Sequence, residues 1–510
     1  MYINILEYFE QVLLSNRTKT AIIDSEKQYS YLDVDKFSKQ VANCLIGQRI
    51  DKNQPVAVYL PKSAEVIFSN LGTIMTGNIY MNLDVKSPVD RIKKIIENIE
   101  PVFIITNNQL ADKIKKCDYP ENKILLWEEV LKANINLEKN ILKERLSKLI
   151  DTDPLCIINT SGSTGTPKGV ILNHKSFIDF TEWAIDTLKI GDSEVVGSLS
   201  PVIFDIYSFE LCMLMAKGST IVLLPDSLAA YPAKLLEIMK DKKVTFIFWV
   251  PTIMVNIANM DLLSKMRLSD LRTVWFAGEV FPTKQFKYWK SHLSEVKFVN
   301  LYGPIEITLD CTYYVIEREL KDEELIPIGF PCRNTDILIL NENNRPATKN
   351  EEGELCVRGT SLAMGYYNNF EKTAAAFVQN PLNNSYPEII YRTGDIVFLN
   401  DHGEINFKGR KDTLIKHLGY RIELGEIEHV IINTLKLVEN GCVVYNHNKK
   451  EITLFYESNK NISIAEMKRA IAEVFPKYMI PTVFCKMDLL PRNPNGKIDR
   501  LHLNTKTNNG

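Results

Sequence analysis

The chain has 510 residues, which is long enough for roughly three domain-sized units around a sizeable buried core. Its 61 lysines and arginines are balanced by 63 aspartates and glutamates, so the formal charge of -2 gives no electrostatic reason to expect nucleic acid or an anionic membrane as a partner. The 9 cysteines are scattered without a C-x-x-C pair and the 7 histidines without H-E-x-x-H spacing, which argues against a disulfide framework and a zinc site.

The N-terminus lacks the features of a targeting segment. Residues 1–14 carry Glu7 and Glu10 and contain no basic region. Every apolar run falls short of the roughly 18 residues that a membrane span needs. We therefore expect a cytoplasmic protein, either a sizeable enzyme or a multi-lobed binding protein.

Helical and strand-like patterns alternate through the first half of the chain. Apolar residues recur at helical spacing in some stretches, and short apolar runs predict buried strands in others. Helices are predicted at 31–46, 64–77, 88–99 and directly after Asn173, which can cap a helix. Strands are predicted at 55–60, 102–106, 220–224, 244–250 and 273–278. The alternation predicts an α/β arrangement in which helices cover the sheets.

The last third of the chain has a different pattern. Short strands punctuated by glycine predict a β-rich subdomain after about residue 330, and a compact unit of strands and helices follows Arg410. We place a domain boundary there, with residues 1–410 as one part and residues 411–510 as the other. The polar residues 504–510 are expected to be disordered.

Residues 159–170, NTSGSTGTPKGV, are the most distinctive stretch. The glycines allow backbone N–H groups to approach an anion and to take up positive φ, the hydroxyls add O–H donors, and Lys168 adds positive charge. The stretch is not a Walker A loop, because Pro167 precedes the lysine and Gly169 follows it. A polar surface turn is the alternative, but the strand-like runs on both sides favour a phosphate-binding loop.

Five further stretches follow in order along the chain. They are WFAGEV at 275–280, NLYGPIEIT at 300–308, YRTGD at 391–395, GRKDTLIKHLGYRIELGEIE at 409–428 and PRNPNGKIDR at 491–500. Together with the loop at 159–170 they resemble the adenylate-forming superfamily, which contains the adenylation domains of nonribosomal peptide synthesis, acyl-CoA synthetases and firefly-type luciferases. The resemblance spans nearly the whole chain. Within this superfamily, the sequence is similar to the stand-alone amino-acid adenylation domains, such as prolyl- or D-alanyl-carrier protein ligases.

The resemblance implies a fold and a reaction. The fold has a large N-terminal part, residues 1–410, of α/β subdomains and a β-rich subdomain, and a small mobile α+β lid, residues 411–510. In the reaction a carboxylate attacks the α-phosphate of ATP to give an acyl-AMP and pyrophosphate, with Mg²⁺ as the metal. A thiol then takes the acyl group and releases AMP.

The resemblance also implies which residues hold the nucleotide and the metal. Nucleotide contacts are expected from Thr160, Ser161, Gly162, Ser163, Thr164, Gly165, Lys168, Gly278, Glu279, Asn300, Leu301, Tyr302, Gly303, Asp395 and Arg410. Tyr302 is expected to stack on adenine and Asp395 to accept hydrogen bonds from the ribose hydroxyls. Glu306 is expected to bind Mg²⁺ beside phosphate oxygens.

Three positions have special roles in this resemblance. Lys497 is the expected catalytic lysine, because an ammonium between the substrate carboxylate and the α-phosphate offsets the repulsion between two anions. Asp412 is the expected hinge about which the lid rotates. Ile305 departs from the family pattern, which has threonine there, and the missing hydroxyl is worth about 1.5 to 3 kcal/mol of ATP binding if nothing compensates.

The substrate positions point to a small amino acid. Asp205 matches the aspartate that amino-acid-activating members place against the substrate α-ammonium, and a buried carboxylate is costly unless it meets a cation. A helix-start carboxylate is the alternative. The expected pocket residues are Asp205, Ile206, Phe209, Phe248, Trp275, Ala277, Leu301, Leu309 and Asp310. Most are large and apolar, which favours a compact side chain such as that of alanine, proline or serine, and Asp310 can read a hydroxyl or a second amine. D-alanine ligases carry a cysteine where Ala277 stands.

No serine-bearing carrier motif lies near the end of the chain, so we expect the thiol partner to be a separate phosphopantetheinyl carrier protein. Two alternatives stay open. One alternative is an acyl-CoA synthetase for a small acid. The other, prompted by Ile305, is a nucleotide-binding protein that does not turn over.

Overall fold

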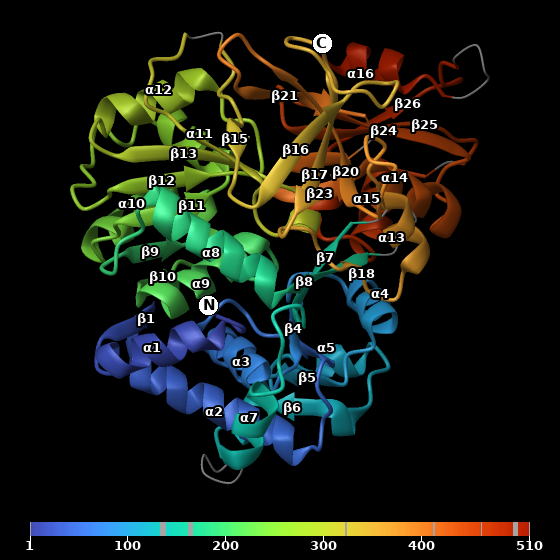
Figure 1. Cartoon of the computed structure of the whole chain (residues 1–510). Coiled ribbons are helices and arrows are strands. Elements are labelled where there is room, and N and C mark those ends of the chain that lie inside the picture. Colours follow the sequence, from blue (N-terminus) through green and yellow to red (C-terminus); the bar gives the residue numbers. More distant parts are fainter. Residues whose placement is uncertain are drawn as a thin grey trace.

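The computed structural model describes residues 2–132, 139–161, 167–321, 324–411, 414–460, 462–492 and 498–508. In these ranges the strands form five sheets, and the chain colours of Figure 1 show that the blue strand β1 (Thr20–Asp24) lies beside the green strands of residues 195–331. In the described part of the chain, no helix is both long enough and apolar enough to cross a membrane.

A nine-stranded sheet forms one half of the N-terminal part. Its strands in spatial order are β15 (Phe330–Pro331), β14 (Thr312–Val315), β13 (Lys297–Tyr302), β12 (Thr273–Phe276), β11 (Phe246–Trp249), β9 (Val195–Ser198), β10 (Thr220–Leu223), β1 (Thr20–Asp24) and β2 (Lys27–Ser30). The strands from β13 to β1 run parallel, and β11 and β10 are buried along their whole length. Continuous apolar runs such as FIFW are what a parallel sheet covered on both faces requires.

Helices cover both faces of this sheet. They are α1 (Leu6–Asn16), α8 (His174–Leu188), α9 (Asp205–Lys217), α10 (Pro232–Asp241), α11 (Pro251–Asn259) and α12 (Thr283–His292), with short turns η2 (Asp226–Ala230) and η3 (Ile305–Ile307). Helices α10, α11 and α12 share one apolar core with the sheet, whereas α1, α8 and α9 belong to another. The predicted cap of α8 is confirmed, because the Asn173 side chain accepts a hydrogen bond from the Ser176 N–H at 2.9 Å.

A seven-stranded sheet forms the other half of the N-terminal part. Its strands in spatial order are β18 (Gly365–Tyr366), β8 (Lys168–Asn173), β7 (Pro154–Thr160), β4 (Ile79–Asn82), β3 (Pro55–Val58), β5 (Phe103–Thr106) and β6 (Ile124–Leu126). Its helices are α2 (Tyr31–Gly47), α3 (Ala64–Met75), α4 (Val89–Ile99), α5 (Ala111–Lys115), α6 (Trp127–Val130), α7 (Lys139–Leu146) and η1 (Glu121–Lys123). The predicted helices and strands of this region are confirmed to within a few residues.

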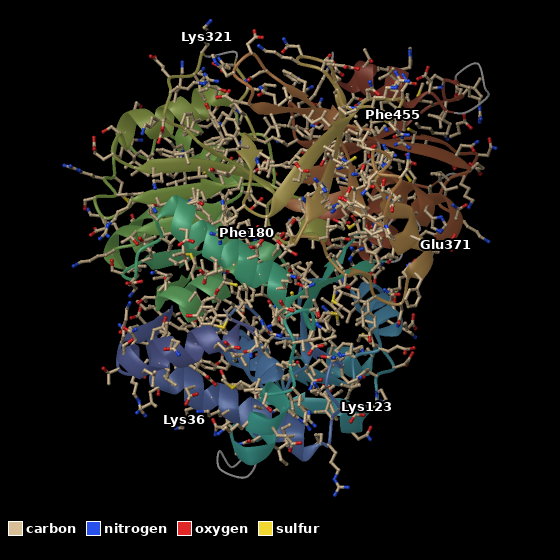
Figure 2. All side chains as sticks on the ribbon, in the orientation of Figure 1. Lys36, Lys123, Phe180, Lys321, Glu371 and Phe455 are labelled. Carbon is tan, nitrogen blue, oxygen red and sulfur yellow. The ribbon has the colours of Figure 1, made fainter. Side chains whose placement is uncertain are left out.

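One apolar core joins the two sheets. Helices α2 and α3 contribute to the same cluster of buried residues as α1, α8 and α9, so these helices lie between the sheets. Gly72 on α3 permits this packing, because a Cβ atom there would lie 2.5 Å from the Cβ atom of Val41 on α2. Figure 2 shows Phe180 of α8 near the middle of the molecule, whereas Lys36, Lys123 and Lys321 lie at its edges.

The predicted β-rich subdomain is a five-stranded antiparallel sheet. It contains β16 (Thr335–Leu340), β17 (Gly353–Gly359), β20 (Ile389–Leu399), β19 (Phe377–Gln379) and β21 (Ile405–Arg410), with α13 (Phe370–Ala376) beside it. Strands β20 and β21 pair so that Asp395 lies opposite Arg410. The register therefore brings two expected nucleotide residues together.

The residues after 413 form a smaller unit with its own apolar core. Its elements are β22 (Leu414–His417), β23 (Tyr420–Glu423), α14 (Leu424–His429), the π-helical turn η4 (Val430–Thr434), β24 (Asn440–Asn446), β25 (Glu451–Glu457), α15 (Ile464–Ala472), η5 (Lys477–Met479), β26 (Val483–Lys486) and α16 (Arg500–Asn508). The expectation that residues 504–510 are disordered is wrong for 504–508, which lie in α16, because Leu503 anchors this helix in the core of the unit. In Figure 1 the red and orange elements of this unit gather on one side of the molecule.

Candidate functional site

The phosphate-loop stretch connects two antiparallel strands. Strand β7 ends at Thr160 and β8 begins at Lys168, and these two residues pair directly. The expected ligands Gly162, Ser163, Thr164 and Gly165 lie outside the described residues. Lys168 is partly buried, its Nζ lies 4.6 Å from the centroid of the Tyr366 ring, and desolvation lowers its pKa.

The reason for glycine at the end of this stretch differs from the expectation. Gly169 lies in β8 and is not among the residues with positive φ. A Cβ atom at this position would lie 2.5 Å from Ile99 Cδ1 and 2.9 Å from Ile157 Cγ2. Close packing of α4 against the sheet, rather than backbone freedom, therefore requires glycine at residue 169.

A cavity of about 470 Å³ lies beside the expected nucleotide residues. Gly278, Glu279, Asn300, Leu301, Tyr302, Asp395 and Arg410 all line it. Residues of the C-terminal unit close its other side, and Leu414, Ile415, Lys416, Leu424, Val444 and Tyr445 are among them. Gly303 is packed against the chain nearby, where a Cβ atom would lie 2.3 Å from the Leu309 carbonyl oxygen. The cavity thus lies between the two parts of the molecule.

Asp395 is the polar centre of this cavity. Its carboxylate accepts a hydrogen bond from the Tyr302 hydroxyl and pairs with the Arg410 guanidinium. Arg410 also donates to the Thr393 carbonyl at 3.0 Å. Asn300 donates to the Pro327 carbonyl at 2.8 Å, which fixes its amide at the cavity wall. Asp395 is 4 % exposed, so its oxygens are oriented by the protein rather than by bulk water.

Glu306 lies in η3 and is completely buried. Its carboxylate accepts a hydrogen bond from the Tyr366 hydroxyl at 2.9 Å and forms an ion pair with Arg421 of β23. Burial raises the pKa of Glu306, but the charges of Arg421 and Lys168 outweigh that effect and hold it at about 2. The carboxylate is therefore ionised at neutral pH, as a metal ligand must be, and in this arrangement it neutralises Arg421.

The hairpin of β22 and β23 reaches into the site from the C-terminal unit. Its two-residue turn has positive φ at Leu418 and at Gly419, as a type I′ turn requires. The Gly419 N–H donates to Glu279 at 2.9 Å. Ser161, an expected phosphate ligand, donates its hydroxyl to the Arg421 carbonyl at 2.8 Å and accepts from the Glu423 N–H at 3.0 Å.

Lys416 and Arg421 are site residues that the sequence reasoning missed. Both lie in the quoted stretch 409–428, where only Arg410 and Asp412 were assigned roles. The Nζ of Lys416 lies 5.8 Å from the centroid of the Tyr302 ring, and desolvation lowers its pKa against the opposing charge of Asp395. The available signal was a pair of basic residues in an otherwise apolar hairpin, IKHLGYRI.

The expected hinge Asp412 and the expected catalytic Lys497 lie outside the described residues. On either side of Lys497, Arg492 and Ile498 form a β-bridge with each other. Ile498 packs against the apolar cluster that contains Val444 and Leu503 of the C-terminal unit.

The expected substrate residues Asp205 and Asp310 lie close enough for their charges to interact. Asp205 is the first residue of α9, and one of its oxygens accepts from the Ile206 N–H at 2.9 Å. The surrounding protein raises the pKa of Asp205 to about 6, although that hydrogen bond and the charge of Lys416 act in the opposite direction. Burial and the charge of Asp205 raise the pKa of Asp310 well above its ordinary value. A cationic group between the two would therefore be stabilised.

Aromatic rings fill the wall of the expected substrate pocket. Trp275 stacks on Phe209 with ring centroids 5.2 Å apart and meets Phe248 edge-on at 5.7 Å. All three rings are 0 % exposed. The other expected wall residues, Ile206, Ala277, Leu301 and Leu309, are also buried. The structure therefore brings Phe209, Phe248 and Trp275 into direct contact with one another.

Backbone strain marks the segment next to this pocket. Thr308 has φ of 48° and Leu309 has φ of 66°, and both side chains are buried. Branched residues rarely adopt positive φ, and such strain of order 1 to 3 kcal/mol per residue concentrates at functional sites. The strained pair lies between Glu306 and Asp310. The backbone conformation at residues 308 and 309 therefore sets the positions of the expected metal ligand and of Asp310 relative to each other.

Sequence comparison finds a matching family and several similar proteins. Residues 9–367 match the model of a family described as AMP-binding enzyme. Tyrocidine synthase 1 of Brevibacillus parabrevis is 29 % identical over 501 residues, which cover 98 % of this chain and 44 % of that protein. The chain thus spans less than half the length of this curated relative. Zwittermicin A synthase ZmaJ of Bacillus cereus is 27 % identical over 508 residues, which cover 97 % of this chain and 94 % of that protein.

The fold agrees with solved structures of adenylation domains. The Vibrio cholerae adenylation domain AlmE, solved in complex with glycyl-adenosine-5'-phosphate, matches with a TM-score of 0.84 at 19 % identity. The match covers 99 % of this chain and 98 % of that chain. It extends over both the N-terminal part and the C-terminal unit.

Proposed function

Because this chain belongs to the AMP-binding enzyme family, we propose that it activates a small amino acid with ATP and transfers it to a separate phosphopantetheinyl carrier protein. The first step forms a bond between the amino-acid carboxylate and the α-phosphate and releases pyrophosphate. The second step forms a thioester with the carrier thiol and releases AMP. We also propose that residues 1–410 and 411–510 are the two functional parts.

The observation that carries this proposal is the placement of Asp205. The carboxylate lies at the start of α9, and burial raises its pKa to about 6, so it is ionised above that pH. A fatty or aryl acid has no cation to offer this carboxylate, whereas the α-ammonium of an amino acid neutralises it. The aromatic wall of Phe209, Phe248 and Trp275 supports a compact substrate. The glycyl-adenylate bound to AlmE is a ligand of this size class.

The nucleotide roles follow from the cavity between the two parts. Tyr302 and Asn300 would line the adenine pocket, and Asp395, held by Tyr302 and Arg410, would accept hydrogen bonds from the ribose. Glu306 would suit a divalent cation when Arg421 is withdrawn, because its carboxylate is buried and ionised. Mg²⁺ bound there would neutralise phosphate oxygens. Lys497 is proposed to bring the positive charge that lets the two reacting anions meet, an assignment that rests on the stretch PRNPNGKIDR.

The test is amino-acid-dependent exchange of labelled pyrophosphate into ATP, measured with the twenty common amino acids and D-alanine. We expect exchange with one or a few compact amino acids. Exchange should fall by at least about a hundredfold in Lys497→Ala and in Asp205→Ala. Lys477→Ala, at a solvated lysine of the same unit, is the matched control and should leave exchange unchanged.

Two outcomes would contradict the proposal. Acyl-CoA formation from a small acid that survives Asp205→Ala would identify an acyl-CoA synthetase. Tight ATP binding without any adenylate after long incubation would identify a nucleotide-binding protein that does not turn over. Transfer is tested separately by adding a phosphopantetheinylated carrier protein and measuring the thioester by intact-protein mass.

A further inference from the structure

The segment that leads into Asp205 is held from outside its own sheet. It runs from Ser198, the last residue of β9, to Phe204, the residue before α9. Lys62 donates from Nζ to the carbonyl oxygens of Ser198 and Ser200, each at 2.7 Å. Asn82 donates from Nδ2 to the Val202 carbonyl at 2.8 Å. Alternate carbonyls of the segment are thus bound by side chains.

These side chains come from the seven-stranded sheet, whereas the segment belongs to the nine-stranded sheet. Lys62 lies between β3 and α3, and Asn82 is the last residue of β4, which pairs with β3. The first turn of α9 is held in the same way, because the Tyr80 hydroxyl donates to Ser208 at 2.9 Å. The two sheets are therefore fixed to each other where the expected ammonium-binding carboxylate is located.

The charged group of Lys62 is enclosed by protein, which is uncommon for a lysine. Burial lowers the pKa of Lys62 against the opposing charges of Glu210 and Asp226, and burial also raises the pKa of Glu210. Glu210 is 1 % exposed and accepts a hydrogen bond from the Ser198 hydroxyl at 2.5 Å. An enclosed ammonium of this kind contributes little net stability compared with apolar packing. It does bind two carbonyls at once with defined geometry.

We propose that Lys62 is a positioning residue for the substrate: by binding the Ser198 and Ser200 carbonyls it fixes the segment 198–204 and so places the Asp205 carboxylate where the α-ammonium binds. This inference rests on the proposed function for the identity of the substrate group. The positioning of the segment itself does not depend on that function. A displacement of about 1 Å at a binding group can cost up to a hundredfold in rate, so the effect is measurable.

The test compares Lys62→Met with a matched control, Lys19→Met. Lys19 also donates from Nζ to two carbonyls, those of Asp192 and Gly218, and Gly218 is the C-cap of α9. The control therefore removes the same kind of bond at the opposite end of the same helix. Hydrogen exchange of peptides covering 198–206 should speed up in Lys62→Met and stay at the wild-type rate in Lys19→Met. Unchanged exchange in Lys62→Met overturns the inference, whatever the substrate is.

Kinetics supply the second readout. The KM for the amino acid in pyrophosphate exchange should rise about tenfold to a hundredfold in Lys62→Met, while the KM for ATP changes less than about twofold. In an Asp205→Asn background the further change Lys62→Met should have almost no effect on the KM for the amino acid, because both act through one carboxylate. Equal increases in both KM values, or additive effects in the double variant, would show a general structural role and overturn the inference.

If wild-type protein supports no exchange with any amino acid, the proposed function fails. The hydrogen-exchange comparison still decides whether Lys62 fixes the segment. The thermal midpoint of each variant is measured in parallel, and Lys62→Gln provides a second neutral variant that retains a donor if Lys62→Met does not fold.

Discussion

Three charged residues dominate the electrostatics of the proposed substrate pocket. Asp205 and Asp310 both have raised pKa values because burial disfavours their ionised forms. Lys416 enters the same region from the C-terminal unit with a lowered pKa. Desolvation disfavours the charged form of each of these three groups. Each group is therefore stabilised in its charged form only by a partner of opposite charge.

The pH dependence of amino-acid use should follow Asp205. Because its pKa is raised to about 6, the carboxyl group is ionised above that pH and neutral below it, and only the ionised form attracts an ammonium. We expect kcat/KM for the amino acid to be constant above a pH of about 7 and to fall about tenfold per unit below about 5.5. Measurement of exchange between pH 5 and pH 8 at saturating ATP checks this. Asp205→Asn should have low kcat/KM with no such fall, and an unchanged profile in that variant would assign the titration to another group.

Ile305 offers a test by gain of function. It is the first residue of η3, directly before Glu306, and it packs at the edge of the core between the two sheets. Ile305→Thr would restore a hydroxyl next to the expected phosphate site, where one hydrogen bond to a charged group is worth about 1.5 to 3 kcal/mol. We expect the Kd for ATP, measured by calorimetry, to fall about tenfold to a hundredfold. Ile305→Val removes a similar volume without adding a hydroxyl and should leave ATP binding unchanged.

Among the elements, regular apolar patterns were predictable and the functional hairpin was not. Strand β11 and helix α3 are continuous or periodic apolar runs, and their predicted positions agree with the structure. The hairpin of β22 and β23 escaped prediction because Lys416 and Arg421 interrupt its apolar pattern. Their partners, Tyr302 and Glu306, lie more than a hundred residues earlier in the chain. Tertiary contacts, not local preference, explain basic residues at these positions.

The turn of this hairpin can be tested through Gly419. Its φ is +82°, and a Cβ atom there would lie 3.0 Å from Val250 Cγ1. Gly419→Ala should therefore hinder docking of the hairpin and slow transfer to the carrier thiol by about tenfold or more, while pyrophosphate exchange changes little. Gly403→Ala is the control, because Gly403 has a similar φ of +73° with no atom near the added carbon. Equal losses of exchange and transfer would show that the hairpin does not act in a separate step.

In the whole molecule, the C-terminal unit has its own core and contacts the N-terminal part through an ion pair and through aromatic rings. Arg91 of α4 forms an ion pair at 2.8 Å with Glu426 of α14, and both side chains are less than 10 % exposed. Tyr420 stacks on Tyr478 at 3.6 Å and meets Phe204 edge-on. The sequence predicted two parts and a boundary near residue 410. It could not predict which surfaces meet, because such contacts depend on the orientation of one part against the other.

Removing one partner of the pair between the two parts should loosen their docking. Arg91→Met removes one partner of this buried ion pair, a change that typically costs about 3 to 5 kcal/mol. We expect limited proteolysis between residues 408 and 416 to become at least about tenfold faster in this variant. The double variant Arg91→Met with Glu426→Leu replaces both charges by apolar groups and should recover most of the protection. If the double variant is cut as fast as the single one, docking depends on the ion pair itself, and the effect of Arg91→Met does not come from the buried charge of Glu426.

The engagement of Glu306 and Ser161 by the hairpin implies an order of events. A carboxylate that neutralises the guanidinium of Arg421 is not available to a metal ion, and a hydroxyl occupied by the backbone of β23 is not available to a phosphate. The docked arrangement and a bound metal pyrophosphate are therefore competing occupants of the same groups. Added pyrophosphate would then delay loading of the carrier by keeping the hairpin out, in addition to reversing adenylate formation. Under the proposed function, turnover would acquire a direction, because departure of pyrophosphate would vacate the groups that the docked hairpin occupies.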